Sequence, residues 1–191
     1  LKFLYDLGLY NYAGISSYPK EKLFELIELL FERKVPIACL QYNLSLISLD
    51  NYKLCKECFY KWKISTIAFS PLGQGLLTDS YFTKSKDIYS RINEKSSTVV
   101  EVTSEMKEGL KYIKDICKKH KISVELMAMA WILSQDFISS AAYGPRNIDQ
   151  IFNMIEIMKL TNELKNSFDL DLLLANSIPE INQWKPRNTR N

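Results

Sequence analysis

The residues that follow the apolar run Ile64 to Phe69 have the types and spacing of a ligand-binding loop. Ser70 and Pro71 come first, and Gly73 and Gly75 stand two residues apart. Proline has no N–H to donate and therefore ends a strand. The glycines allow positive φ and a close approach of the backbone to a ligand. We therefore predict a buried strand that opens into a tight loop, which is where α/β barrels carry their sites.

Two other groups have residue types that do chemistry, but their settings predict structural roles. Cys55 and Cys58 have the spacing of a metal-ligand pair, yet a structural zinc site needs four ligands and no second pair stands nearby. Both thiols fall on the apolar face of a predicted helix, so we predict core packing. His120 is the only histidine and lies in a basic run at a predicted helix end, so we predict a surface residue and no catalytic base.

Strands and helices alternate along the chain, which predicts an α/β fold with parallel strands. The predicted strands are Tyr12 to Ser16, Ile37 to Tyr42, Ile64 to Phe69 and Phe137 to Ala142. Six helices are predicted. The first begins at Pro19, the second spans Leu49 to Trp62, and the third begins near Ser104. The fourth spans Val124 to Ser134, the fifth starts after Asn147, and a short last helix spans 161–174. The pair Gly73 and Gly75 lacks the third glycine of a Rossmann fingerprint, so that fold is disfavoured.

Apolar spacing predicts which helix faces are buried. The first stripe is Leu23, Leu26, Ile27, Leu30 and Phe31, and the last is Ile151, Met154, Ile155 and Met158. The helix from Val124 to Ser134 is apolar nearly all round and is expected to be buried on several sides. Ser123 is its predicted N-cap, and Asn147 with Gln150 has the spacing of a capping box.

Composition and length favour one ordinary globular unit over residues 1–191. Hydrophobic residues make up 47% of the chain, charged residues 25%, and the net charge is +3, too small and scattered to indicate nucleic-acid binding. No apolar run reaches the ~18 residues of a membrane span. The four scattered cysteines predict reduced thiols in a cytoplasmic protein. Residues 79–103 are expected to form a long surface loop and 179–191 an irregular tail. Since residue 1 is Leu1 and not Met, we expect the chain to begin inside a longer gene product.

Five motifs in order resemble the second half of the aldo-keto reductases, which fold as eight-stranded (β/α)8 TIM barrels. They are Gly14-Ile-Ser-Ser-Tyr18, Gln41-Tyr-Asn43, Phe69-Ser-Pro-Leu-Gly-Gln-Gly75, Ala128-Met-Ala-Trp-Ile-Leu133, and Gly144-Pro-Arg-Asn147 with Gln150. The resemblance extends from Leu7 to about Leu174. It implies that four βα units of this chain correspond to strands five to eight of that barrel.

The resemblance implies a site for the nicotinamide end of NADPH. Ser16 and Ser17 would meet the carboxamide, and Gln41 would reach the same amide with its donor and acceptor. Phe69 would stack on the nicotinamide ring. The family has Asn more often at the position of Ser17, and Tyr or Trp at the position of Phe69. From the residues alone, Ser16, Ser17 and Gln41 could instead satisfy strand-end backbone groups, and Phe69 could belong to the core.

The same resemblance implies contacts to the phosphates and the adenosine. The residues expected along the pyrophosphate are Ser70, Pro71, Leu72, Gly73 and Gly75. Gly144 would precede Arg146, whose guanidinium would pair with the 2′-phosphate. Gln150 would face the adenosine, and Arg91 would reach its phosphate from the long loop. At Met154 the family often has Asn.

The resemblance also implies what this chain lacks. In the family an Asp, Tyr, Lys and His tetrad on the first four strands reduces an aldehyde or ketone. No residue here is assigned to it, so we expect the cofactor half of a reductase without the acid–base half. Two open sheet edges would require a partner, either the missing half or a second copy. The alternative is a catalytically inactive nucleotide-binding or regulatory protein, like the potassium-channel β-subunit relatives.

Overall fold

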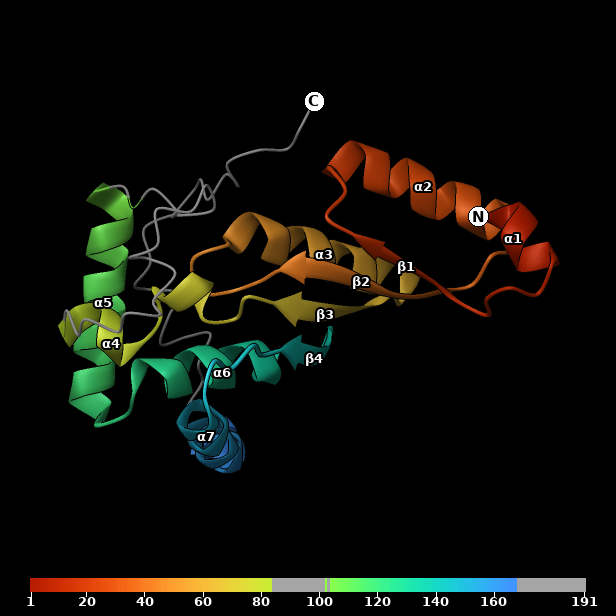
Figure 1. The fold of residues 1–191 in the computed structure, drawn as a ribbon. Coiled ribbons are helices and arrows are strands. Elements are labelled where there is room, and N and C mark those ends of the chain that lie inside the picture. The colour runs from red at the N-terminus through yellow and green to blue at the C-terminus, as the bar shows by residue number, and fades with distance from the viewer. Residues whose placement is uncertain (84–101, 103, 168–191) are drawn as a thin grey trace.

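Four parallel strands form one sheet in the computed structural model, which describes residues 1–83, 102 and 104–167. The strands β1 (Ala13–Ser16), β2 (Ile37–Asn43), β3 (Ser65–Phe69) and β4 (Ile138–Ala142) pair in sequence order. The four predicted strands and their parallel direction are therefore confirmed. Within the described residues, β1 and β4 each have one unpaired edge, as expected (Figure 1).

Helices follow the strands and bury one side of the sheet. Between β1 and β2 runs α2 (Lys20–Glu32), and between β2 and β3 runs α3 (Leu49–Trp62). Figure 1 shows the two helices over the same side of the sheet. Their contacts include an edge-to-face pair of Phe24 and Trp62 and the ion pair of Lys61 with Glu28. Cys55 and Cys58 are buried on α3, which confirms their predicted core packing. On α2, Phe31 is exposed and was wrongly included in the buried stripe.

Two helices precede β4, and the second of them is buried nearly all round. The first is α5 (Ser104–His120), and the second is α6 (Val124–Ser134). Eight of the eleven residues of α6 are buried, which confirms that this helix is covered on several sides. It begins at the predicted cap, where the Ser123 side chain accepts a hydrogen bond from the Leu126 N–H at 3.0 Å. His120, at the end of α5, is half-buried.

The last described helix, α7 (Ile148–Ser167), corrects two predictions. It continues without a break through 161–167, so no separate helix begins there, and the rest of the predicted segment lies outside the described residues. Among the α7 residues whose burial the structure describes, Met154, Ile157 and Thr161 are buried. Ile151, Ile155 and Met158 are exposed, because α7 packs mainly against α6 and turns a different face toward it.

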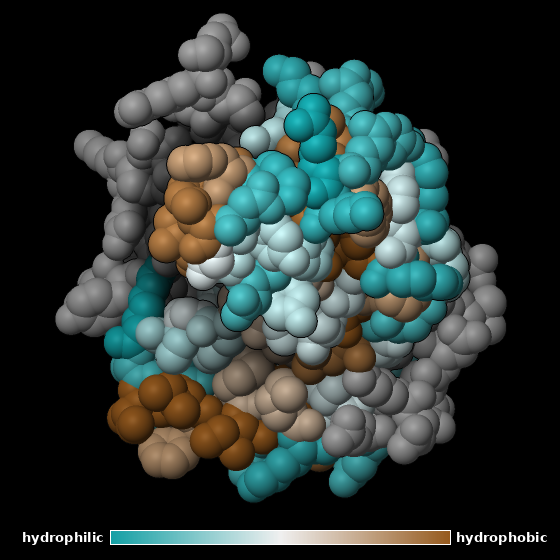
Figure 2. All heavy atoms as spheres, turned by 90° about the vertical axis from the view of Figure 1, so that its right-hand side faces the viewer, coloured by the Kyte–Doolittle hydropathy of each residue, from teal (hydrophilic) through white to brown (hydrophobic). Residues whose placement is uncertain are grey.

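The exposed residues of α7 form a second apolar stripe along the helix. Ile148, Ile151, Phe152, Ile155 and Met158 recur at helical spacing and are each at least 40% exposed. Apolar side chains gather at the lower left of Figure 2, at the height of α7 in Figure 1. We call these five residues the α7 stripe.

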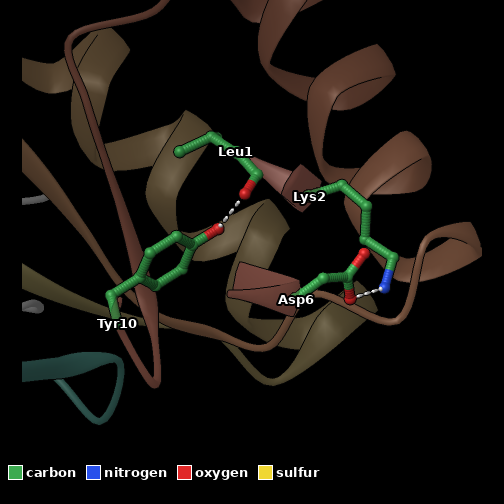
Figure 3. A network of polar contacts seen from close by, with 4 residues as sticks. All are labelled: Leu1, Lys2, Asp6 and Tyr10. Carbon is green, nitrogen blue, oxygen red and sulfur yellow. Dashed lines mark hydrogen bonds and ion pairs between the residues drawn. The ribbon is translucent and has the colours of Figure 1, made fainter. Parts of the chain in front are cut away.

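The chain also begins and continues with short helices that the sequence did not indicate. The first is α1 (Lys2–Asp6), where Lys2 and Asp6 form an ion pair and the Tyr10 hydroxyl donates to the Leu1 carbonyl at 3.0 Å (Figure 3). The second is α4 (Asp79–Thr83), which follows a 3-10 turn, η1 (Gly73–Gly75). The expected loop at 79–103 is therefore wrong for its first five residues, while 84–101 and the tail at 179–191 lie outside the described part.

A lysine with a left-handed backbone conformation follows within two residues of the end of each of the helices α2, α3 and α5. Lys34, Lys63 and Lys121 have φ of 54°, 59° and 56°. After α2 the Val35 N–H donates to the Leu30 carbonyl, and after α5 the Ile122 N–H donates to the Cys117 carbonyl. These bonds are typical of the motif that turns a chain out of a helix, where glycine is the usual residue at the left-handed position.

Candidate functional site at the carboxyl ends of the strands

Strand pairing brings the predicted nicotinamide residues to one edge of the sheet. Ser16 is paired with Gln41, Asn43 is paired with Phe69, and Phe69 is paired with Ala142. These residues end four neighbouring strands that all run in the same direction. Ser16, Gln41 and Phe69, which lie far apart in the sequence, therefore share the carboxyl edge.

The same residues lie on the side of the sheet that the helices leave open. Along β1 and β2 the residues Ile15, Leu40 and Tyr42 are buried, whereas Ser16 and Gln41 are exposed. Successive side chains of a strand point to opposite faces, so Ser16 and Gln41 lie on the open face. Phe69 is half-buried on that face, at the end of β3. Part of the Phe69 side chain is therefore accessible.

The backbone turns sharply where β1 meets its loop. Ser17 has a φ of 58°, and its N–H donates to the Gln41 carbonyl at 3.3 Å. The hydroxyl oxygens of Ser16 and Ser17 lie 3.3 Å apart. Non-glycine residues adopt positive φ uncommonly, and such strained positions cluster at ligand sites. The turn keeps both hydroxyls at the edge beside Gln41.

The loop after β3 is more strongly wound than the sequence alone indicates. Ser70, Gly73 and Gln74 have φ of 53°, 55° and 58°. The N–H groups of Gly73 and Gly75 donate to the carbonyls of Ser70 and Leu72 at 2.9 and 3.0 Å. These internal hydrogen bonds hold the loop in a tight turn. Gly73 and Gly75 both have positive φ, 55° and 102°, which confirms the predicted backbone conformation. A Cβ at Gly73 would also lie 2.7 Å from Ile47 Cδ1.

The segment after β4 begins α7 with an altered capping arrangement. Asn147 Oδ1 accepts a hydrogen bond from the Gln150 N–H at 2.9 Å, as predicted. The Gln150 side chain accepts from the Arg146 N–H at 2.7 Å and not from the Asn147 N–H, so the reciprocal half of the capping box is wrong. Gly144 and Arg146 are exposed. The Arg146 guanidinium is therefore accessible, whereas Arg91 lies outside the described residues.

Two polar residues near this edge were not identified from the sequence. Asn43 is buried at the end of β2, and its Oδ1 accepts no hydrogen bond within the described part of the chain. Glu125, in the first turn of α6, accepts a hydrogen bond from the Asp79 N–H at 3.0 Å. The signal for Asn43 was available, because it stands two residues after Gln41 in the strand and therefore points to the same face. The contact of Glu125 spans 46 positions and has no local signature.

Burial controls the titration of the thiols on helices α3 and α5. It raises the pKa of Cys55 and of Cys117 to about 12 each, and the pKa of Cys58 to about 11. These thiols are protonated at neutral pH and suit packing better than nucleophilic chemistry. Among the described residues, no three His, Cys, Asp or Glu side chains gather as a metal site requires. None of the described helices is long and apolar enough to cross a membrane.

Parallel strands alternating with helices, with polar residues gathered at the strands' carboxyl ends, are consistent with part of an α/β barrel. The chain belongs to the aldo/keto reductase family, whose model matches residues 1–169. The family resemblance seen in the sequence is thereby confirmed.

Curated relatives support this assignment. The chain is 29% identical over 182 residues to L-glyceraldehyde 3-phosphate reductase of Escherichia coli K12, covering 91% of this chain and 51% of that protein. It is 34% identical over 79 residues to the chloroplastic pyridoxal reductase of Arabidopsis thaliana, covering 41% of this chain and 22% of that protein. It is also 26% identical to protein tas of Escherichia coli K12 over 156 residues, covering 80% of this chain and 44% of that protein. The chain thus spans about half the length of the first of these relatives.

Proposed function

We propose that this chain is the NADPH-binding half of an aldo-keto reductase whose full-length form reduces aldehydes or ketones by hydride transfer. The observation that carries the proposal is the meeting of Ser16, Gln41 and Phe69 at one strand edge, beside the wound loop after Ser70. The family match and the coverage of about half a relative support it.

In the proposed complex, each part of the edge serves one part of the cofactor. Ser16, Ser17 and Gln41 hold the carboxamide, which needs both donors and acceptors. Phe69 packs against the nicotinamide ring. When bound, NADPH supplies the hydride, and the protein residues orient it toward the substrate.

The phosphates and the adenosine would lie along the loops after β3 and β4. Four loop residues, Pro71, Leu72, Gly73 and Gly75, frame the pyrophosphate together with Ser70. Arg146 follows Gly144 and binds the 2′-phosphate, while Gln150 faces the adenosine. Arg91 belongs to the same proposal.

The proposal includes a partner and a limit on activity. The free edges of β1 and β4 and the α7 stripe favour a complementary half-barrel, from the missing half or from a second copy. The acid–base tetrad would belong to the other half. We therefore expect only background oxidation of NADPH when the chain is assayed alone with reactive aldehydes. Clear turnover would show that a residue of this chain supplies the proton.

Cofactor titration tests the binding role directly. NADPH should bind the chain more tightly than NADH, as measured by the change in cofactor fluorescence. Arg146→Ala should weaken NADPH binding about ten- to a hundredfold and change NADH binding little, since a charge-assisted hydrogen bond contributes roughly 1.5–3 kcal/mol.

The matched control for this titration is Arg33→Ala. It removes the same charge at the C-cap of α2, at the opposite end of the sheet. This variant should bind both cofactors as the parent chain does. Equal losses for NADPH and NADH in Arg146→Ala would show that Arg146 is structural, and the phosphate assignment would fail.

The alternative function is an inactive nucleotide-binding or regulatory protein. The position of His120 at the end of α5 does not separate the two hypotheses, because the reductase hypothesis places the acid–base tetrad on the other half. Both hypotheses share NADPH binding. They separate when a complementary half is added, since turnover then appears only for the reductase.

A further inference from the structure

The first N–H groups of α4 are bound by side chains from two different parts of the chain. Thr78, which precedes the helix, accepts a hydrogen bond from the Tyr81 N–H at 3.3 Å through its hydroxyl oxygen. Glu125 of α6 accepts one from the Asp79 N–H at 3.0 Å. Helix N-termini leave such donors without partners inside the helix, and a carboxylate there is favoured by the helix dipole. Glu125 therefore fixes the start of α4 to the start of α6.

Hydrogen bonds continue from this point into the loop after β3. The Thr78 hydroxyl donates to the Gly75 carbonyl at 2.7 Å, and the Leu77 N–H donates to the Leu72 carbonyl at 3.1 Å. Leu76 and Leu77 between them are buried. A short series of hydrogen bonds thus links the backbone next to Asp79 to Leu72 and Gly75, so the position of Asp79 affects the position of both.

The setting of Glu125 is unusual for an ionisable side chain. Burial raises its pKa, and the Asp79 carboxylate beside it acts in the same direction, while Lys114 of α5 opposes both. Lys114 Nζ also lies 4.5 Å from the centre of the Phe82 ring of α4. Thus α4 is held from both α5 and α6. Burial disfavours a carboxylate, and the hydrogen bond from the Asp79 N–H offsets part of that cost.

We propose that Glu125 is a positioning residue, which sets the shape of the loop from Ser70 to Thr78 by holding the Asp79 N–H. The consequence for cofactor binding rests on the proposed function, because the loop is where the pyrophosphate is expected. The effect on the loop itself does not depend on any ligand.

Amide hydrogen exchange in the full chain without cofactor tests the positioning role. Glu125→Ala should speed exchange at Asp79 and at Leu77 about tenfold or more. Glu125→Gln should restore slow exchange, because its side-chain oxygen still accepts the bond. The Met129 amide, in the middle of α6, serves as the reference for global unfolding and should be unchanged in both variants. Equal exchange at Asp79 and Leu77 in all three proteins would overturn the proposal.

NADPH titration of the same three proteins tests the consequence. Binding should weaken about tenfold in Glu125→Ala and stay within about twofold in Glu125→Gln. Faster loop exchange with unchanged NADPH affinity would overturn the link to the cofactor. If Glu125→Gln behaves like Glu125→Ala, the charge and not the hydrogen bond holds the loop, and the proposal fails. If the parent chain binds no NADPH while the exchange results hold, the proposed function fails and the positioning role stands.

Discussion

The neighbouring helices α6 and α7 are both rich in apolar residues, but only α6 is buried nearly all round. The difference follows from their neighbours. Helix α6 packs against α5, β4 and α7, whereas α7 packs mainly against α6 and keeps the α7 stripe exposed. The apolar composition of a helix therefore indicates which side chains can be buried, but only the packing of neighbouring elements determines which of them are buried. A second apolar face of α7 therefore stays exposed within the described part of the chain.

A matched pair of methionine substitutions gives the largest expected contrast. Met127 on α6 is 1% exposed and Met158 on α7 is 45% exposed. Met127→Ala should lower the free energy of unfolding by about 2–5 kcal/mol, because it leaves a cavity in the core. Met158→Ala should change it by no more than about 0.5 kcal/mol. Urea denaturation followed by circular dichroism measures both. Similar losses would show that α7 is covered in solution.

A charged substitution in the α7 stripe should reduce self-association. An exposed apolar stripe and two free strand edges make the isolated chain association-prone, so we expect oligomers or aggregates. Phe152→Glu should weaken association about ten- to a hundredfold. Burial of one large apolar side chain contributes about 1.5–3 kcal/mol, and the substitution removes that contribution. Light scattering during size exclusion is the measurement, and Glu156→Gln on the same helix is the control. A monodisperse monomer of the parent chain would contradict the interpretation of both features.

Thiol labelling compares a half-buried cysteine of the sheet with the buried cysteines of the helices, and we expect a smaller difference here than for the substitutions above. Cys39 of β2 is half-buried, whereas Cys55, Cys58 and Cys117 are buried. At pH 8, iodoacetamide should label Cys39 at least about ten times faster than the others, since the thiolate is the reactive form and their pKa values are about 11–12. Peptide mass spectrometry assigns the sites. Early labelling of Cys55 would mean that the covered side opens.

The same pKa values fix the sign of an alkaline effect. Unfolded thiols ionise near their ordinary pKa of 9.0, while buried Cys55 and Cys117 stay protonated up to about 12. The unfolded chain therefore binds fewer protons than the folded chain over this range, and stability should fall as the pH rises above about 9.

Local patterns predicted the elements that depend on local physics. The strand from Ile37, the helix ending at Trp62 and the cap at Ser123 follow from periodicity and end signals within a few residues. The buried face of α7 did not, because two apolar stripes share that helix and only tertiary packing selects Met154 and Ile157. The motifs identified the family, and they correctly placed Ser16 and Phe69 at the ends of neighbouring strands. They did not reveal the hydrogen bond of Glu125, since nothing in sequence links residues so far apart.

The three lysines that follow helices α2, α3 and α5 have a consequence for engineering this protein. Lys34, Lys63 and Lys121 occupy a backbone conformation that a side chain disfavours by about 1 kcal/mol and that glycine adopts freely. All three follow helices, away from Ser17, Ser70 and Gln74, where the same conformation shapes the strand-end loops. Glycine at the three lysine positions should therefore raise the thermal stability of the chain and leave the conformation of the strand-end loops unchanged.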